Sequence, residues 1–222
     1  MTDAGHDHTT ASPEHTTSSP DLIKLDHLAV EESLRLLTAA RADDWDRPTP
    51  CAGWTLRRLV AHMAAQHHGF AAAARGSGAD RTYWFEPDLS REYGQEPLKI
   101  YEESVRHVLA AFAEDGVPGR LFVLPDFGAS FPGRVAVGFH FLDYVVHAWD
   151  VAVTVGGELR LADDVVEAAL AVALRVPTDP ERRGPGAAFA PARRLPDGEG
   201  PLARMLAHLG RDPHHGANPT AR

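Results

Sequence analysis

The chain has 222 residues, 44% of them hydrophobic, which suits one domain with a single core. Its formal net charge of -9 excludes the basic surface that nucleic acids or anionic membranes require. The single cysteine excludes an internal disulfide framework and fits a reducing compartment, and no run of about 18 apolar residues could span a membrane. We therefore expect a cytoplasmic protein whose partner is a small molecule, with neither nucleic acid nor membrane among its ligands.

The first half of the chain predicts a polar tail followed by two helices. Residues 1–20 are rich in Thr, Ser, His and Pro and hold almost nothing to bury, so we expect them to be disordered. Apolar residues at helical spacing predict a helix from about Leu22 to Asp43, which two prolines then end. A second helix is predicted from Thr55, whose hydroxyl can cap the first turn, to about Ala74. Residues 79–97 show no clear period and are expected to form a long loop.

The second half predicts further helices and one short extended segment. These elements are a helix from about Leu98 to Glu114, an extended run at Leu121–Leu124, a long helix closed by Gly156 and Gly157, a helix from Asp163 to about Arg175, a loop over residues 176–200, and a short amphipathic helix from Pro201 to Leu209. Four long helices, two shorter ones and little strand predict an all-α helix bundle.

The long helix before Gly156 carries a polar seam within an apolar surface. At about 100° per residue, five residues fall within one narrow arc with large apolar side chains on both sides. These residues are His140, Asp143, His147, Asp150 and Thr154. A buried seam of His and Asp needs partners, because unpaired polar groups are costly to bury. No Lys, Arg or Glu occurs between residues 135 and 157, so we favour a metal or catalytic site over a solvated helix edge.

Two residues of the seam have the spacing of metal ligands. Asp143 and His147 lie four residues apart, so both can reach one divalent ion from adjacent turns of a helix. A catalytic site needs a third protein ligand and an open position, and bundles recruit ligands from facing helices. His62 on the second predicted helix is the best candidate for the third ligand. The alternative is that His62 is a core histidine satisfied by a hydrogen bond.

His67 and His68 point away from His62 by helical angle and are expected at the surface.

Three motifs stand out along the chain: PTPCAGWTLRRLVAH at residues 48–62, DYVVHAWDVA at residues 143–152 and LAHLGRDP at residues 206–213. In this order they resemble the start, the second signature and the closing segment of the DinB-like metal-binding family, which is related to the N-terminal domain of mycothiol-dependent maleylpyruvate isomerase. The resemblance covers about residues 25 to 213, and these three motifs in this order are fairly specific.

The resemblance implies a DinB-like four-helix bundle in which a histidine, an acidic residue and a histidine hold one metal ion. These roles fall on His62, Asp143 and His147. The isomerase itself has Glu where Asp143 stands, and the shorter Asp would draw the ion toward its helix and leaves the identity of the ion open. In thiol-using relatives a thiolate attacks an electrophilic carbon, giving isomerisation or S-transfer. The implied cofactors are one divalent metal ion, with zinc favoured, and mycothiol as co-substrate; a homodimer follows by analogy alone.

Three further residues are candidates for roles around this metal. His140, one turn before Asp143, could orient a ligand or shuttle a proton. Asp150 could accept a hydrogen bond from His62, although an ordinary structural role is the favoured interpretation. Cys51 lies just before a helix N-terminus, where a thiolate is stabilised, but the surrounding Pro-rich loop favours a structural role.

We expect a single DinB-like domain over residues 21–213, followed by a second disordered tail at residues 214–222. The sequence leaves three functions open for this domain. The favoured one is a metal-dependent, mycothiol-using transferase or isomerase that acts on a small electrophilic metabolite. The second is a thiol-free enzyme whose metal is a Lewis acid for cyclisation, elimination or hydrolysis. The third is a non-catalytic metal-binding protein.

Overall fold

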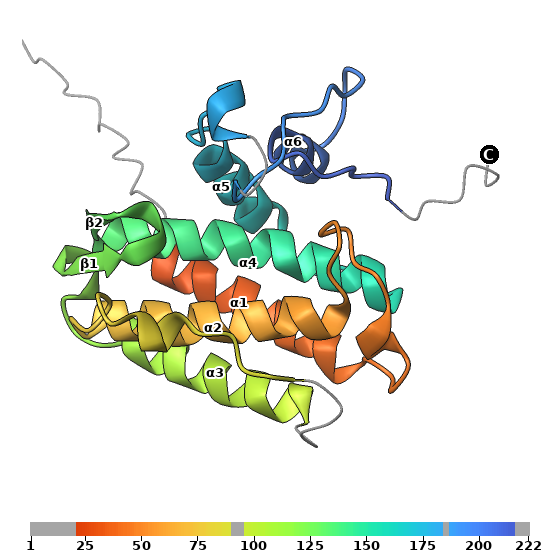
Figure 1. Cartoon of the computed structure of the whole chain (residues 1–222). Helices are drawn as coiled ribbons and strands as arrows, with labels where there is room; N and C mark the ends of the chain where they lie inside the picture. Colours follow the sequence, from red (N-terminus) through yellow and green to blue (C-terminus); the bar gives the residue numbers. More distant parts are fainter. Residues whose placement is uncertain (1–20, 90–95, 184–186, 216–222) are drawn as a thin grey trace, which may run out of the picture.

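The computed structural model describes residues 21–89, 96–183 and 187–215, which form a bundle of four long helices with two shorter helices on one side (Figure 1). The helices are α1 Leu22–Thr38, α2 Leu56–Ala74, α3 Pro97–Phe112, α4 Gly133–Val155, α5 Asp163–Ala173 and α6 Pro201–His208. The predicted all-α, DinB-like bundle is confirmed. The tail expected at residues 1–20 lies outside the described residues, as does the tail expected at residues 214–222 apart from its first two residues.

The bundle is held by helix faces that bury aliphatic side chains. Helix α1 packs against α4 and α2 against α3, while contacts between α1 and α3 and between α2 and α4 close the arrangement. Leu36, Leu59 and Val145 are among the core residues with almost no exposed surface. Each such side chain contributes about 1.5–3 kcal/mol relative to an exposed one, so the four apolar faces supply the main driving force for this fold.

Helix α4 is the central element of the bundle. It is covered by α1 and α2 on one side and by α5 on the other, and most of its residues are buried, as the sequence predicted. Buried polar residues on it include His140, His147, Asp150 and Thr154. Gly156 ends the helix in the left-handed conformation, with φ 69°, which glycine adopts without steric cost.

The loop before α2 is a compact turn that positions the start of that helix. Thr49 and Trp54 are joined by a backbone hydrogen bond of 2.9 Å, and the Thr49 hydroxyl donates to two carbonyl groups within the same loop. Thr55 caps α2 by accepting a hydrogen bond from the backbone N–H of Arg58, as predicted. Trp54 is thereby held beside the first turns of α2.

A short hairpin precedes α4. Strands β1, Leu121–Leu124, and β2, Ala129–Pro132, pair antiparallel, which confirms extended structure for the apolar run. Gly133 then starts α4 in a tight space, because a Cβ atom there would lie 1.9 Å from the Val117 carbonyl oxygen. Only glycine allows this close approach.

The clearest difference from the predicted boundaries is at the end of the first helix. Helix α1 ends at Thr38, before Asp43, because the buried Asp44 side chain accepts hydrogen bonds from the Arg41 N–H and from Arg47 and so stabilises a separate short turn. The described residues of the long loop after α2 include the 3₁₀ turn Arg81–Trp84. Within the parts of the chain that the structure describes, no helix has both the length and the apolar surface that crossing a bilayer would demand.

Candidate metal centre

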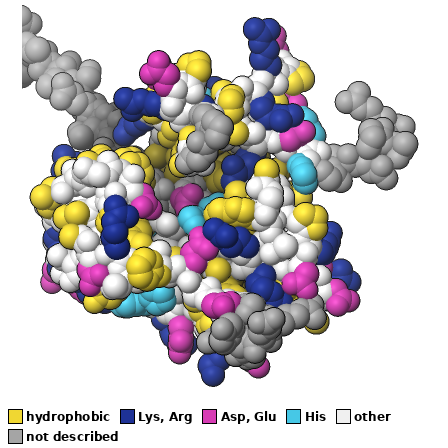
Figure 2. Space-filling model, viewed as in Figure 1, with side chains coloured by type: hydrophobic (Ala, Val, Ile, Leu, Met, Phe, Trp, Pro, Cys, Tyr) yellow, Lys and Arg dark blue, Asp and Glu magenta, His cyan; other side chains and the backbone are white. Residues whose placement is uncertain are grey.

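Helices α2 and α4 bring together the three residues that the sequence nominated as ligands. One ligand atom each from His62, Asp143 and His147 lies within 4.8 Å of the other two, and among the described residues this is the one such group of three. The His147 side chain is 5% exposed, whereas those of His62 and Asp143 are 24% and 30% exposed. The group therefore has a buried floor and an open side, and Figure 2 shows acidic and histidine side chains inside a hollow on this face.

The spacing of the donor atoms fits one divalent ion. The His147 Nε2 atom lies 3.4 Å from the Asp143 Oδ1 atom. Neighbouring ligands of a tetrahedral ion, with bonds of about 2.0–2.2 Å, lie about 3.3–3.6 Å apart. Two imidazole nitrogens and one carboxylate oxygen, with one side left open, are also the donor set of catalytic zinc sites.

A buried carboxylate orients His147. The His147 Nδ1 atom lies 3.0 Å from the Asp150 Oδ2 atom, so the proton is held on Nδ1 and the Nε2 lone pair is left for an ion. Burial opposes a charge on His147, but the nearby Asp143 and the hydrogen bond to Asp150 outweigh it and raise the pKa of His147. Without a metal, this ring is therefore protonated more readily than a free histidine.

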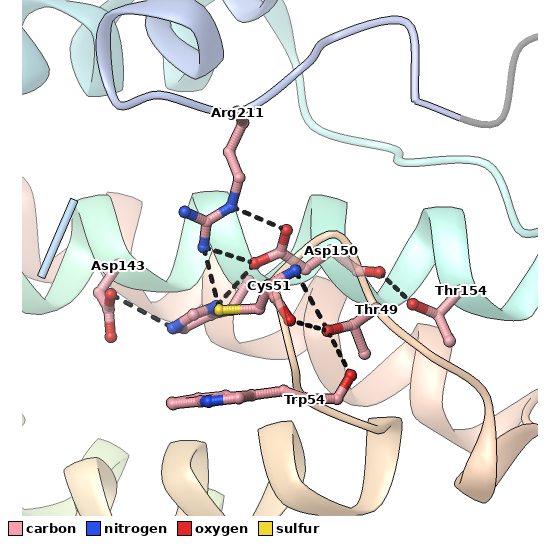
Figure 3. Close-up of polar contacts among 8 residues, drawn as sticks. Thr49, Cys51, Trp54, Asp143, Asp150, Thr154 and Arg211 are labelled. Carbon is pink, nitrogen blue, oxygen red and sulfur yellow. Dashed lines mark hydrogen bonds and ion pairs between the residues drawn. The ribbon is translucent and has the colours of Figure 1, made fainter. Parts of the chain in front are cut away.

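Arg211 secures that carboxylate from the C-terminal segment. Its Nε and Nη2 atoms donate to the two oxygens of Asp150 at 3.1 and 3.0 Å, and Nη2 also lies 3.5 Å from the Cys51 sulfur (Figure 3). Burial alone would raise the pKa of Asp150, but His147 and Arg211 together hold it below its usual value. The preceding Gly210 has φ +85°, and this left-handed turn after α6 directs Arg211 into the bundle.

Glu86 lies beside the other histidine. Its Oε1 atom is 3.6 Å from the Nδ1 atom of His62, and its Oε2 atom forms an ion pair with the Nε atom of Arg58 at 2.8 Å. The contact with His62, together with Arg58, lowers the pKa of Glu86. Trp54 packs edge-on against His62 with 5.0 Å between the ring centroids. Each histidine of the site thus has a carboxylate near its Nδ1 atom.

The structure corrects the partner expected for Asp150. This residue accepts a hydrogen bond from His147, on its own helix, and not from His62. Both histidines line the same site, but His147 lies three residues before Asp150 on α4, so its Nδ1 atom comes within reach without any contribution from α2.

His140 lies apart from the three ligands. Its Nδ1 atom is 2.6 Å from the Asp26 Oδ1 atom of α1, and its ring stacks on Tyr144 with 4.2 Å between centroids. Both His140 and Asp26 have fully buried side chains. The hydrogen bond that the structure shows for His140 therefore ties α4 to α1.

His67 is buried, which overturns its expected surface position. Its Nδ1 atom lies 2.8 Å from the Ser104 hydroxyl of α3, and its ring stacks on Tyr144 at 4.3 Å. Burial lowers the pKa of His67 well below its usual value. The expectation failed because α2 is covered by α3 and α4 on different sides, so a residue that points away from His62 still meets another helix. His68 is only partly buried.

The Cys51 thiol supports the structural interpretation. Burial raises its pKa to about 11, and the neighbouring Arg211 offsets this only in part. A thiol with this pKa is protonated at neutral pH, whereas a nucleophilic cysteine requires a thiolate. The contact that the structure shows for the Cys51 sulfur is with Arg211, at 3.5 Å.

A family profile described as the mycothiol maleylpyruvate isomerase N-terminal domain matches residues 27–152, more than half of the chain. The chain belongs to this family. The matched segment contains all three candidate ligands and Asp150, whereas α5, α6 and Arg211 lie beyond it.

Individual proteins are similar to this chain in sequence or in fold. Uncharacterized proteins Rv0738 and MT0763 from two strains of Mycobacterium tuberculosis are each 32% identical over 176 residues, covering 79% of this chain and 90% of the relative. Crystal structures of the mycothiol-dependent maleylpyruvate isomerase and of a histidine-to-alanine mutant superpose with TM-scores of 0.56 and 0.57, at 16% and 17% identity. Each alignment covers 76% of this chain and 72% of that structure, which shows a shared fold.

Proposed function

We propose that this protein is a metal-dependent transferase or isomerase that acts on a small electrophilic metabolite. It would use a small-molecule thiol of the mycothiol type as its co-substrate. His62, Asp143 and His147 would hold one divalent ion, with zinc favoured. The observation that carries the proposal is that these three donors converge in a group in which His147 is buried while His62 and Asp143 are partly exposed. Structural zinc sites are normally closed by four protein ligands, so three ligands and an open side favour catalysis over a metal staple.

The chain's own residues provide orientation and charge. Asp150, held by Arg211, would keep the Nε2 atom of His147 turned toward the ion, and Glu86 would act in the same way from the Nδ1 side of His62. A divalent ion, when bound, lowers the pKa of a thiol or water at its open position. Trp54 forms an apolar wall beside His62, and Arg58 lies over the Trp54 ring at 5.0 Å.

The family supports the choice of thiol and of reaction class. The related crystal structures are of an enzyme named as mycothiol-dependent and as an isomerase. A thiolate that adds to an electrophilic carbon can be expelled again after bond rotation, giving isomerisation, or retained, giving transfer. The same metal centre can serve both outcomes, so the substrate determines the product.

The test combines metal content with thiol dependence. The purified full-length chain is analysed for metal, and its turnover of maleylpyruvate and of other small electrophiles is measured with and without mycothiol. We expect His62→Ala and His147→Ala to lose one equivalent of metal together with thiol-dependent turnover. His27→Ala is the matched control, because His27 is an exposed histidine on α1 that pairs with Glu31 at 3.0 Å.

Three outcomes would contradict the proposal. Unchanged metal content in both ligand variants would remove the metal centre. Equal turnover without thiol would favour Lewis-acid chemistry at the same ion. Tightly bound metal without turnover of any electrophile in the panel would favour a non-catalytic metal-binding protein.

A further inference from the structure

A second pair of histidines lies outside the site described above. His68 of α2 and His107 of α3 face one another across the helix interface, with 3.1 Å between their Nδ1 atoms and 5.3 Å between their ring centroids. Neither belongs to the group of His62, Asp143 and His147. Both side chains are only partly buried, and Figure 2 shows histidine side chains reaching the surface over α2 and α3. Solvent and dissolved ions can therefore reach this pair.

The separation of the two nitrogens is that of two neighbouring ligands on one metal ion. With metal–nitrogen bonds of about 2.0–2.1 Å, nitrogens 3.1 Å apart subtend an angle of about 100° at the ion. That angle lies between the octahedral and the tetrahedral values. In the metal-free chain the same two nitrogens share a hydrogen bond, which a bound ion would replace. In the candidate metal centre the corresponding separation, between His147 and Asp143, is 3.4 Å.

The protonation state of the pair favours ligation. Burial and the neighbouring His107 lower the pKa of His68, and burial and the neighbouring Arg75 lower the pKa of His107. Both rings are therefore neutral at neutral pH, and a neutral imidazole is the form that binds a metal.

We propose that His68 and His107 form a second divalent transition-metal site that clamps α2 to α3. Its ligand is an ion of the class that prefers imidazole, namely Ni²⁺, Cu²⁺ or Zn²⁺. With two histidines and a more exposed setting, it binds more weakly than the three-ligand centre. It is independent of catalysis and rests only on the contact between two helices of the bundle.

The test is the effect of Ni²⁺ on thermal unfolding of the full-length, metal-stripped protein. A variant with His62→Ala and His147→Ala together removes the first centre, so any remaining stabilisation comes from elsewhere. Because only metal bound to the folded state raises the melting temperature, we expect Ni²⁺ to raise that variant's Tm by about 5–10 °C when free Ni²⁺ is about 100 times Kd. Adding His68→Ala or His107→Ala abolishes the rise, and adding His27→Ala does not.

Calorimetric titration with Ni²⁺ gives the second readout. The wild type binds one equivalent more than His68→Ala or His107→Ala, and histidines in residues 1–20 contribute the same background to every variant. If the metal-free His68→Ala variant is too unstable to measure, His107→Ala gives the same comparison, because His107 is the more exposed of the two histidines. A rise in Tm that survives both substitutions, or no rise in the variant lacking the first centre, overturns the proposal. Failure of the first centre alone leaves this result unchanged, so the two proposals fail separately.

Discussion

Two of the histidine clusters in the bundle draw on α2 and α4, and their surroundings differ. In the metal centre, His62 and His147 converge with Asp143 on an open side. In the inner cluster, defined here as Asp26, His67, Ser104 and His140, each histidine has one hydrogen-bond partner inside the core. His140 and His147 lie seven residues apart on one face of α4, so residue type and helix face are shared. Access to solvent and the convergence of three donors distinguish a candidate reactive site from a structural contact.

The largest effect that tests this comparison is the loss of a metal ligand. Removing a residue that orients a ligand lowers metal affinity by about 10–100-fold. We expect His147→Ala to lower it further, because a bond between a ligand and the ion is itself lost. Its thermal stability without metal should change far less than its metal affinity. Metal content by elemental analysis and unfolding of the metal-free protein give both numbers. Full metal retention would place the ion elsewhere.

The inner cluster should respond in the opposite way. Asp26→Ala leaves the Nδ1 atom of the buried His140 without its partner, which costs about 3 kcal/mol of unfolding free energy. For a chain of this size, that lowers Tm by about 6–12 °C. The variant should still bind one equivalent of metal at the first centre. Chemical denaturation and metal analysis of the same sample separate the two effects, and unchanged stability would contradict the structural role.

An intermediate effect is expected at the residue that orients His147. Asp150→Asn replaces the charged acceptor that keeps the His147 proton on Nδ1 by a weaker, neutral amide oxygen, so metal affinity should fall by about 10–100-fold. Thr154→Val is the control, because the Thr154 hydroxyl donates only to the Asp150 backbone carbonyl. Competition with a chelator measures both variants. Equal affinities would show that Asp150 serves only to neutralise Arg211.

The smallest effect is a pH dependence from His67. Its pKa in the folded protein lies well below the value of 6.5 for an exposed histidine, so below pH 6.5 the unfolded chain binds more protons. The stability it contributes is present above pH 6.5 and is lost as the pH falls, by at most about 1.4 kcal/mol per pH unit. His67→Phe keeps a ring against Tyr144 and should flatten this slope in denaturation between pH 7 and 5. An identical slope in both proteins would contradict the assignment.

The sequence predicted much of this arrangement for reasons that can be named. The spacing of Asp143 and His147 places both on one helix face in any α-helix, and the apolar surroundings on α4 required a buried environment. The start of α2 followed from the capping hydroxyl of Thr55. These are local properties, and the tertiary structure left them unchanged.

The residues that sequence reasoning missed are those that reach the site from loops. Glu86 lies in a segment without periodicity, and nothing local indicates that it approaches His62. Arg211 had a weak signal, since it follows a glycine directly after an amphipathic helix within the closing motif, but its partner Asp150 lies 61 positions earlier in the chain. Long-range contacts of this kind depend on how the connecting segments fold back.

The sequence by itself determined the helices, the buried polar seam and two ligands at a separation of one helical turn. Only the tertiary structure decided which side of each helix stays open. It placed Arg211 against Asp150, buried His67 against α3, and set His68 beside His107. The physical reason is that helical periodicity fixes the angle between side chains on one helix, whereas packing between helices decides what each angle faces.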